Sequence, residues 1–149
     1  TNVEFYGTIY NKTKVRKCVI TVFTNGCFDI IHAGHIDYLE ESKRICQGGK
    51  LIVGLNSDAS MKRIKRKPFH TQDNRKRVLE ALKCVDEVII FEEDTPLELI
   101  KKIRPTYITK GGDYEPEFVV GREYAMLKIL DLYPSESSSK ILEFINGKT

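Results

Sequence analysis

The chain has 149 residues, of which 41% are hydrophobic and 30% charged, and its formal net charge is +3. This length fits one domain with a buried core, and the composition is that of an ordinary globular protein. The small net charge does not by itself indicate a nucleic-acid partner, and no apolar run is long enough to span a membrane. The four cysteines show neither zinc-site spacing nor a C-x-x-C pair. We therefore expect a single domain over residues 1–149 in a reducing compartment, the cytoplasm.

The first half of the chain begins with a polar, basic segment and then alternates between apolar and amphipathic stretches. Residues 1–17 have no clear period and predict an arm or a short strand. The apolar run 18–23 predicts a buried strand, and residues 35–46 predict a helix that ends at a pair of glycines. Residues 51–55 predict a second buried strand.

The second half continues the alternation. An amphipathic helix is predicted over 73–84, followed by a strand over 87–91. The next helix opens at Pro96 and closes at Pro105, and residues 107–109 predict a fourth strand. A fifth strand over 128–132 and a terminal helix over 139–146 complete the pattern. Strand–helix alternation with short connections predicts an α/β, Rossmann-like fold, a doubly wound parallel five-stranded sheet with helices on both faces.

One motif stands out at the junction of the first predicted strand and helix. Residues 24–35 read T-N-G-C-F-D-I-I-H-A-G-H and lie at the carboxyl end of that strand, where open α/β sheets bind ligands. His32 and His35 enter the start of the helix, whose free N–H groups and dipole favour anions. Gly34 has no side chain where a phosphate would approach the backbone. The motif therefore predicts a site for a phosphate chain, against the alternative of two histidines that only cap the helix or face solvent.

The H-A-G-H sequence at 32–35, preceded by T-N-G-C-F-D, resembles the H-x-G-H signature of the cytidylyltransferase-like nucleotidyltransferases. The resemblance implies that His32 and His35 are catalytic, holding nucleotide phosphates and stabilising charge as pyrophosphate leaves. It also implies nucleotide contacts from the rest of the motif: Thr24, Asn25, Gly26, Phe28, Asp29 and Gly34.

Basic residues follow the second predicted strand. The run K-R-I-K-R-K at 62–67 comes shortly after N-S-D and is similar to the family pattern N-S-D-x-S-x-K-R. This likeness implies that Lys62 holds phosphates of nucleotide and substrate, while Lys65 and Lys67 remain solvated or steering charges. A solvated face and a nucleic-acid patch are the alternatives. The family pattern also has an arginine before an apolar helix, and Arg75 is its better match here. This likeness implies that Arg75 takes the substrate phosphate, which a guanidinium can bind bidentately, against the alternative of a surface arginine.

Two later segments also follow predicted strands. K-G-G-D-Y at 110–114 is similar to the adenylyltransferase domain of ADP-heptose synthases, and S-S-S-K-I at 137–141 resembles a phosphate-binding segment of the family. The alternatives are a plain turn and serines that only cap a helix. The nucleotide contacts implied here are Lys110, Gly111, Gly112, Asp113, Ser138 and Ser139.

Together these likenesses imply a nucleotidyltransferase that joins ATP and D-glycero-D-manno-heptose 1-phosphate into ADP-heptose, releasing pyrophosphate. Mg²⁺ is expected as cofactor on the ATP, with no protein ligand assigned to it. A homodimer is expected, with neither nucleic acid nor membrane as partner. The alternatives are a CTP-dependent cytidylyltransferase for glycerol 3-phosphate or a similar alcohol, a nucleotide-binding regulatory module, and a nucleic-acid binder. Kinase-type ATPases, ordinary dehydrogenases and serine hydrolases are disfavoured, because the P-loop, G-x-G-x-x-G and G-x-S-x-G motifs are absent.

Overall fold

The computed structural model describes residues 3–5, 8–11, 14–112, 115–131 and 137–147. Five of its strands form one parallel sheet in the order β6-β5-β4-β7-β8. These strands are β4 (Thr21–Gly26), β5 (Lys50–Asn56), β6 (Glu87–Phe91), β7 (Tyr107–Gly111) and β8 (Met126–Leu130). The helices around it are α1 (Ala33–Ile45), α2 (Asp58–Ile64), α3 (Gln72–Glu80), α4 (Leu97–Ile103), the 3₁₀ turn η1 (Pro116–Phe118) and α5 (Ser138–Ile145). The predicted five-stranded, Rossmann-like parallel fold is confirmed.

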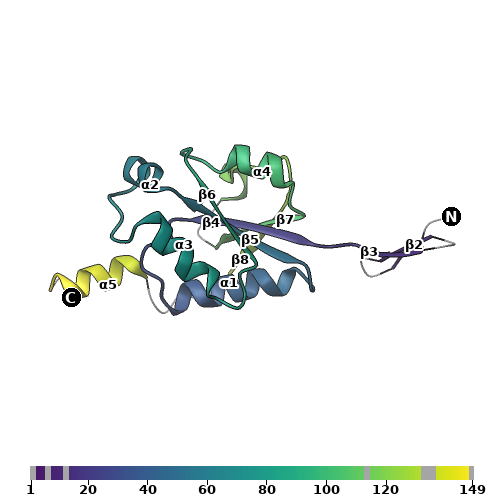
Figure 1. Cartoon of the computed structure of the whole chain (residues 1–149), viewed down its shortest axis with the longest axis horizontal. Helices are drawn as coiled ribbons and strands as arrows, with labels where there is room; N and C mark the ends of the chain where they lie inside the picture. Colours follow the sequence, from purple (N-terminus) through teal and green to yellow (C-terminus); the bar gives the residue numbers. More distant parts are fainter. Residues whose placement is uncertain (1–2, 6–7, 12–13, 113–114, 132–136, 148–149) are drawn as a thin grey trace.

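Alternating side chains of the strands form a separate core on each face of the sheet. Val22 packs with α1 and α3 through Leu39 and Leu79. Its neighbour Phe23 faces the other way and packs with Ile100 of α4. Figure 1 shows this layering, with α4 above the sheet and α1 and α3 below it. The sheet is therefore covered on both faces, as a doubly wound fold requires.

The order of the strands places a topological switch point between β4 and β7. The chain moves from β4 to β5 and β6 on one side, then returns across the sheet to β7 and β8 on the other. Ligands of open α/β sheets bind outside the carboxyl ends of the strands at such a point. The fold therefore directs attention to the ends of β4 and β7.

The first strand of the sheet begins three residues later than its apolar run suggests. Residues 18–23 were the prediction, whereas β4 pairs with β5 from Thr21 to Gly26. Thr24 is accommodated because its buried hydroxyl hydrogen-bonds the Tyr38 hydroxyl at 2.7 Å. The first part of the T-N-G motif is thus strand and not loop.

Other boundaries differ in smaller ways. Helix α2 follows β5 directly, and its N-cap Ser57 accepts a hydrogen bond from Ser60 N. The fifth strand begins two residues before the predicted 128–132. The N-terminal arm forms three antiparallel strands, β1 (Val3–Phe5), β2 (Thr8–Asn11) and β3 (Lys14–Lys17).

Candidate active site

A cavity of about 430 Å³ opens at the carboxyl ends of β4, β5 and β7, at the switch point of the sheet. The predicted site residues that line it are Asn25, Gly26, Phe28, Asp29, His35, Lys110, Gly111 and Ser138. They come from the end of β4, the following loop, the start of α1, the end of β7 and the start of α5. Segments up to about a hundred residues apart in the chain therefore meet at one place, as the loop-end argument predicts.

The two histidines cap helix α1 reciprocally. Gly34 N donates to His32 Nδ1 at 3.1 Å, and His32 N donates to His35 Nδ1 at 3.3 Å. The backbone N–H groups of His35 and Ile36 donate to His32 O. With Nδ1 of each ring accepting, the proton of a neutral imidazole lies on Nε2. The N–H of Gly34 is thus used within the cap and is not free to meet a phosphate.

His35 is held as a neutral donor at the cavity wall. Burial, with smaller contributions from His32 and Lys65, lowers the pKa of His35 to about 4. Its ring lies 3.9 Å from the His32 ring and 5.4 Å from the Phe28 ring, centroid to centroid. A neutral imidazole with Nδ1 engaged has one further polar group, the Nε2–H. That group suits an anionic oxygen and needs no change of protonation to donate.

Gly26 is required by the packing of Phe28. Phe28 has a left-handed backbone with φ of 47°, and its ring folds back over the end of β4. A Cβ at position 26 would lie 2.9 Å from Cε2 of that ring. Gly26 thus shapes the cavity through Phe28, which in turn packs against His35.

Lys110 and Asn25 join the ends of the two strands on either side of the switch point. Lys110 Nζ donates to Asn25 Oδ1 at 2.6 Å. Burial lowers the pKa of the Lys110 ammonium to about 8. The side chain is therefore cationic at neutral pH and partly desolvated, a setting in which attraction to a phosphate is stronger than at an exposed surface.

Asp29 fixes the loop between α2 and α3. Its carboxylate accepts from Phe69 N and His70 N, each at 2.8 Å, and from Arg66 Nη1 at 2.8 Å. Burial would raise the pKa of this carboxyl, but the hydrogen bonds from His70, Phe69 and Arg66 outweigh it and lower the pKa. The Asp29 carboxylate therefore holds this loop in place. Its expected contact with the nucleotide stays a prediction.

The loop presents different cations from the one expected. Lys62 lies on the exposed surface of α2 and is not among the lining residues of the cavity. Lys65 and Arg66, which follow the end of α2, do line it. Lys65 is also close enough to lower the pKa of His35. Lys65 and Arg66 are therefore the cations of this segment at the cavity wall, while the phosphate contact expected of Lys62 stays a prediction.

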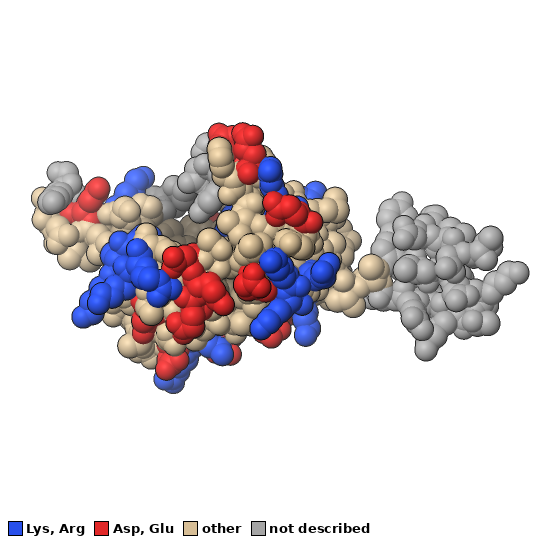
Figure 2. Space-filling view, turned by 90° about the horizontal axis from the view of Figure 1, so that it is seen from above, with Lys and Arg blue, Asp and Glu red and all other residues tan. Residues whose placement is uncertain are grey.

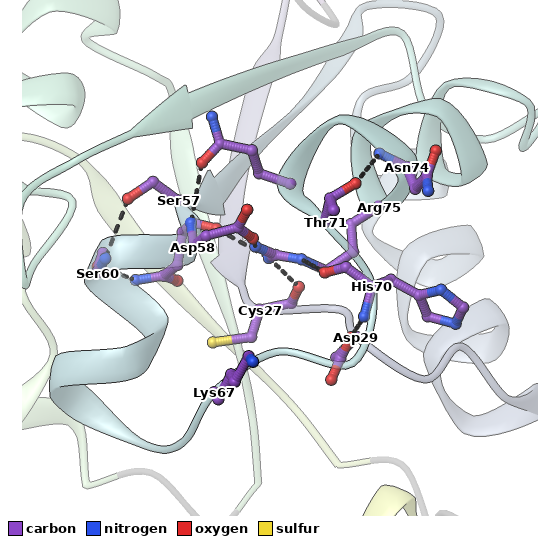
Figure 3. Close-up of polar contacts among 12 residues, drawn as sticks. Cys27, Asp29, Ser57, Asp58, Ser60, Lys67, His70, Thr71, Asn74 and Arg75 are labelled. Atoms are coloured by element: carbon purple, nitrogen blue, oxygen red, sulfur yellow. Dashed lines mark hydrogen bonds and ion pairs between the residues drawn. The ribbon is translucent and has the colours of Figure 1, made fainter.

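Arg75 has a structural position and does not line the cavity. Its side chain is fully buried, and its guanidinium donates to three backbone carbonyls and to Asp58 Oδ1. The carbonyl acceptors are those of Cys27, Asn56 and His70, at 2.8, 2.8 and 3.1 Å. Figure 3 shows the guanidinium between Cys27 and Asp58, with Asp29 bonded to the loop nearby. This arrangement speaks against the expected contact with a substrate phosphate, because the donors are already engaged.

The remaining predicted residues divide between support and surface. Thr24 is fully buried and hydrogen-bonded to Tyr38. Gly112 lies against Asp131, and Ser139 is exposed on α5. Ser138 lines the cavity and donates to Ile30 O at 3.2 Å, tying α5 to the loop before α1. Asp113 lies outside the described residues.

Sequence reasoning missed Tyr38, Lys65 and Arg66 as lining residues. Tyr38 lies one turn after His35 on the same helix, a spacing that brings both side chains to one face. The spacing of His35 and Tyr38 could therefore have predicted that Tyr38 lines the cavity. The position of Lys65 could not be predicted in this way, because it depends on where α2 ends.

Neither a metal-binding cluster nor a membrane-spanning helix is found in the described part of the chain. Among the described residues, no group of three or more His, Cys, Asp or Glu side chains is arranged to hold a metal ion. No helix in the described part of the chain is long and apolar enough to cross a membrane.

Comparison with known proteins bears directly on this geometry. The model of the family described as Cytidylyltransferase-like matches residues 23–143. The chain belongs to this family. The match begins in β4 and ends in α5, so it includes the segments that line the cavity.

Curated relatives and a solved structure agree with the family assignment. The bifunctional protein HldE of Helicobacter hepaticus is 51% identical over 127 residues, covering 83% of this chain and 26% of that protein. HldE of Syntrophotalea carbinolica is 44% identical over 137 residues, covering 87% and 28%. This chain therefore spans about a quarter of the length of these relatives. The crystal structure of a lipopolysaccharide core biosynthesis protein from Thermoplasma volcanium superposes with a TM-score of 0.67 at 28% identity, covering 78% of this chain and 99% of that one.

Proposed function

We propose that the chain is a nucleotidyltransferase that transfers a nucleoside monophosphate to a sugar 1-phosphate. The reaction proposed is ATP plus D-glycero-D-manno-heptose 1-phosphate giving ADP-heptose and pyrophosphate. The observation that carries the proposal is the cavity at the switch point, where the neutral His35 faces Lys65, Arg66 and Lys110. Membership of the cytidylyltransferase-like family and the 44–51% identity to HldE proteins support it.

The chemistry needs charge neutralisation more than proton transfer. An oxygen of the acceptor phosphate attacks the α-phosphorus and forms a new P–O bond, while the bond to the β-phosphate breaks and pyrophosphate leaves with the electron pair. The acceptor phosphate is already ionised at neutral pH, so no protein base is required. His35 donates a hydrogen bond to the oxygens on which charge grows, and Lys65, Arg66 and Lys110 attract the phosphates from two sides of the cavity.

Mg²⁺ fits this site as an ion that arrives on the triphosphate. The carboxylate at the cavity, Asp29, is engaged by two backbone N–H groups and by Arg66. A cation bound to triphosphate oxygens and water needs no protein cage. When bound there, Mg²⁺ would neutralise part of the phosphate charge.

The second candidate is CTP-dependent transfer to glycerol 3-phosphate or a similar alcohol, which the name of the family model favours. The test is to incubate the protein and Mg²⁺ with each nucleoside triphosphate against heptose 1-phosphate and glycerol 3-phosphate, and to measure pyrophosphate release. Release with ATP and heptose 1-phosphate alone is the expected result. Release with CTP and glycerol 3-phosphate would replace the substrate assignment and keep the reaction type. No release with any pair would contradict the enzyme assignment in favour of a nucleotide-binding module.

We also propose that the protein works as a cytoplasmic homodimer and does not bind nucleic acid. Figure 2 shows Lys and Arg side chains in separate groups with Asp and Glu side chains between them, so the visible face is of mixed charge. Light scattering should give the mass of two chains, and a mass of 17.1 kDa would contradict the dimer. Steeply salt-dependent binding to duplex DNA would contradict the exclusion of nucleic acid.

A further inference from the structure

A second, smaller cavity lies against the same Asn25 and Lys110 that line the first. Its volume is about 170 Å³, compared with about 430 Å³ for the first. The rest of its wall comes from the connection between β6 and α4, with Asp94 and Thr95, and from the segment around η1, with Phe118 and Val119. The proposed reaction as described so far uses none of these four residues.

The wall of the second cavity combines polar groups with an aromatic ring. Thr95 supplies a hydroxyl and Asp94 a carboxylate, whose Oδ1 already accepts a hydrogen bond from Arg63 Nε at 2.8 Å. Hydroxyls and carboxylates are groups that hydrogen-bond sugar hydroxyls. The side chain of Phe118 is 77% exposed, whereas Val119 beside it is 4% exposed and packs into the core below. An exposed aromatic ring offers an apolar surface to the C–H face of a sugar.

The size of this cavity also selects its occupant. Pockets that enclose a whole drug-sized ligand usually measure several hundred Å³. The first cavity is in that range and the second is below it, so the second suits a single ring and not a nucleotide.

Transfer of a nucleotidyl group requires two neighbouring subsites. The acceptor phosphate must meet the α-phosphorus in line with the leaving group, so the pockets for the two substrates must share a boundary. Asn25 and Lys110 form such a boundary, because both residues line both cavities. Lys110 therefore stands where an acceptor phosphate and the α-phosphate would come together.

We infer that the second cavity binds the sugar ring of the phosphorylated acceptor, with Phe118 beneath the ring and Thr95 and Asp94 at its hydroxyls. The inference rests on the proposed function and gives it an acceptor site. It also assigns a role to the segment around η1.

The test measures acceptor binding apart from turnover. Heptose 1-phosphate is titrated calorimetrically into protein saturated with a non-hydrolysable ATP analogue, and inorganic phosphate is titrated in parallel. Phe118→Ala should weaken heptose 1-phosphate binding roughly tenfold, the scale of one lost aromatic contact, and Thr95→Val should weaken it by a few-fold. Affinity for the ATP analogue and for inorganic phosphate should stay within about twofold of the wild type. The matched control is Phe144→Ala, since Phe144 is 73% exposed on α5 and lines neither cavity.

Pyrophosphate release, measured on the same samples, separates the two claims. Release with heptose 1-phosphate, but wild-type heptose affinity in both Phe118→Ala and Thr95→Val, would overturn the acceptor site and leave the reaction standing. Heptose 1-phosphate binding that depends on Phe118, without release, would support the sugar site and overturn the reaction. Absence of both binding and release would overturn both.

Discussion

Burial shifts the pKa of Lys110 and of His35 in the same direction but leaves them with different charges at neutral pH. Burial lowers the pKa of both, to about 8 for Lys110 and to about 4 for His35. At neutral pH the lysine is therefore still protonated, whereas the histidine has lost its charge. The site combines a desolvated cation with a neutral donor, and the two respond to different ranges of pH.

The pH dependence of ATP affinity should follow Lys110. An anionic ligand prefers the protonated lysine, so affinity should be constant near pH 7 and fall as the pH rises through about 8. A guanidinium stays protonated throughout this range, so Lys110→Arg should remove the fall even if affinity changes overall. The affinity for ATP can be measured by calorimetric titration from about pH 6.5 to about pH 9.5, a range that brackets the pKa of Lys110. The same fall in Lys110→Arg would contradict the assignment.

Removing the imidazole of His35 should affect both turnover and stability. His35→Ala loses a donor to the developing charge, so kcat should fall roughly 100-fold. It also loses half of the reciprocal cap of α1, which should lower the free energy of unfolding by about 1 kcal/mol. Pyrophosphate release and urea unfolding measure the two effects. His70→Ala is the control, because the His70 side chain is exposed and its backbone N–H keeps its bond to Asp29; loss of turnover in this variant would argue against a specific role for His35.

At the scale of elements, the start of α3 is attached to the sheet by one buried side chain. Arg75 links this helix to the loop after β4, to the end of β5 and to the start of α2 through its four acceptors. A single guanidinium thus holds together the segments that frame the cavity.

Arg75→Met should destabilise the protein severely. The substitution leaves backbone carbonyls of Cys27 and Asn56 without their donor in a buried setting, which should lower the free energy of unfolding by about 3–5 kcal/mol. Arg77→Met on the exposed face of the same helix should change it by less than about 0.5 kcal/mol. Chemical denaturation measures the free energy of unfolding of both variants. Equal losses in the two variants would show that the buried contacts of Arg75 contribute nothing to stability.

A group of hydroxyls joins α1 to β4 and β7. Tyr38 OH lies 2.7 Å from Thr24 Oγ1 and donates to Thr109 Oγ1 at 3.2 Å, and Ser42 Oγ lies 2.9 Å from the same Thr109 oxygen. Thr24 and Thr109 directly precede Asn25 and Lys110 in their strands. These hydroxyls therefore fix the position of α1, which carries His35, relative to β4 and β7, which carry Asn25 and Lys110.

Tyr38→Phe tests whether this position of α1 matters for activity. The loss of the hydroxyl should cost about 1 kcal/mol of unfolding free energy. If the group positions the site, kcat should fall several-fold, while affinity for ATP changes little. Ser42→Ala is the comparison, because Ser42 contacts Thr109 but neither cavity. A Tyr38→Phe enzyme with wild-type kcat would show a purely structural role.

The elements differ in how far they could be predicted from the residues. The parallel sheet followed from the apolar runs and is confirmed. The ligand-binding edge followed from the polar loop ends and stays a prediction, although a cavity lies at that edge. Helix α2 was missed, since it is seven residues long and begins at polar residues that also suit a turn. The choice between Lys62 and Lys65 depended on that helix. The burial of Arg75 was beyond prediction as well, because its acceptors are carbonyls brought in from three distant segments.

At the scale of the whole molecule, ligand binding should stabilise the entire fold. The cavity is built from both halves of the sheet, so an unfolded chain has no site, and ATP at 100 times its dissociation constant should add about 2.7 kcal/mol. For a chain of this size that raises the midpoint of thermal unfolding by roughly 6–10 °C. A thermal shift assay over a series of ATP concentrations measures it. A midpoint that does not move with ATP would contradict nucleotide binding at this site.

The contact between Lys110 and Asn25 joins residues 85 positions apart, and it has a consequence for the order of synthesis. A growing chain that has emerged as far as β6 contains the histidines and the loop cations, but β4 is still an edge strand because its neighbour β7 does not yet exist. Such an edge is open to pairing with other chains. Nucleotide can protect only a chain that has already released β7, so the early intermediate gains no protection from ATP, whatever its concentration in the cell.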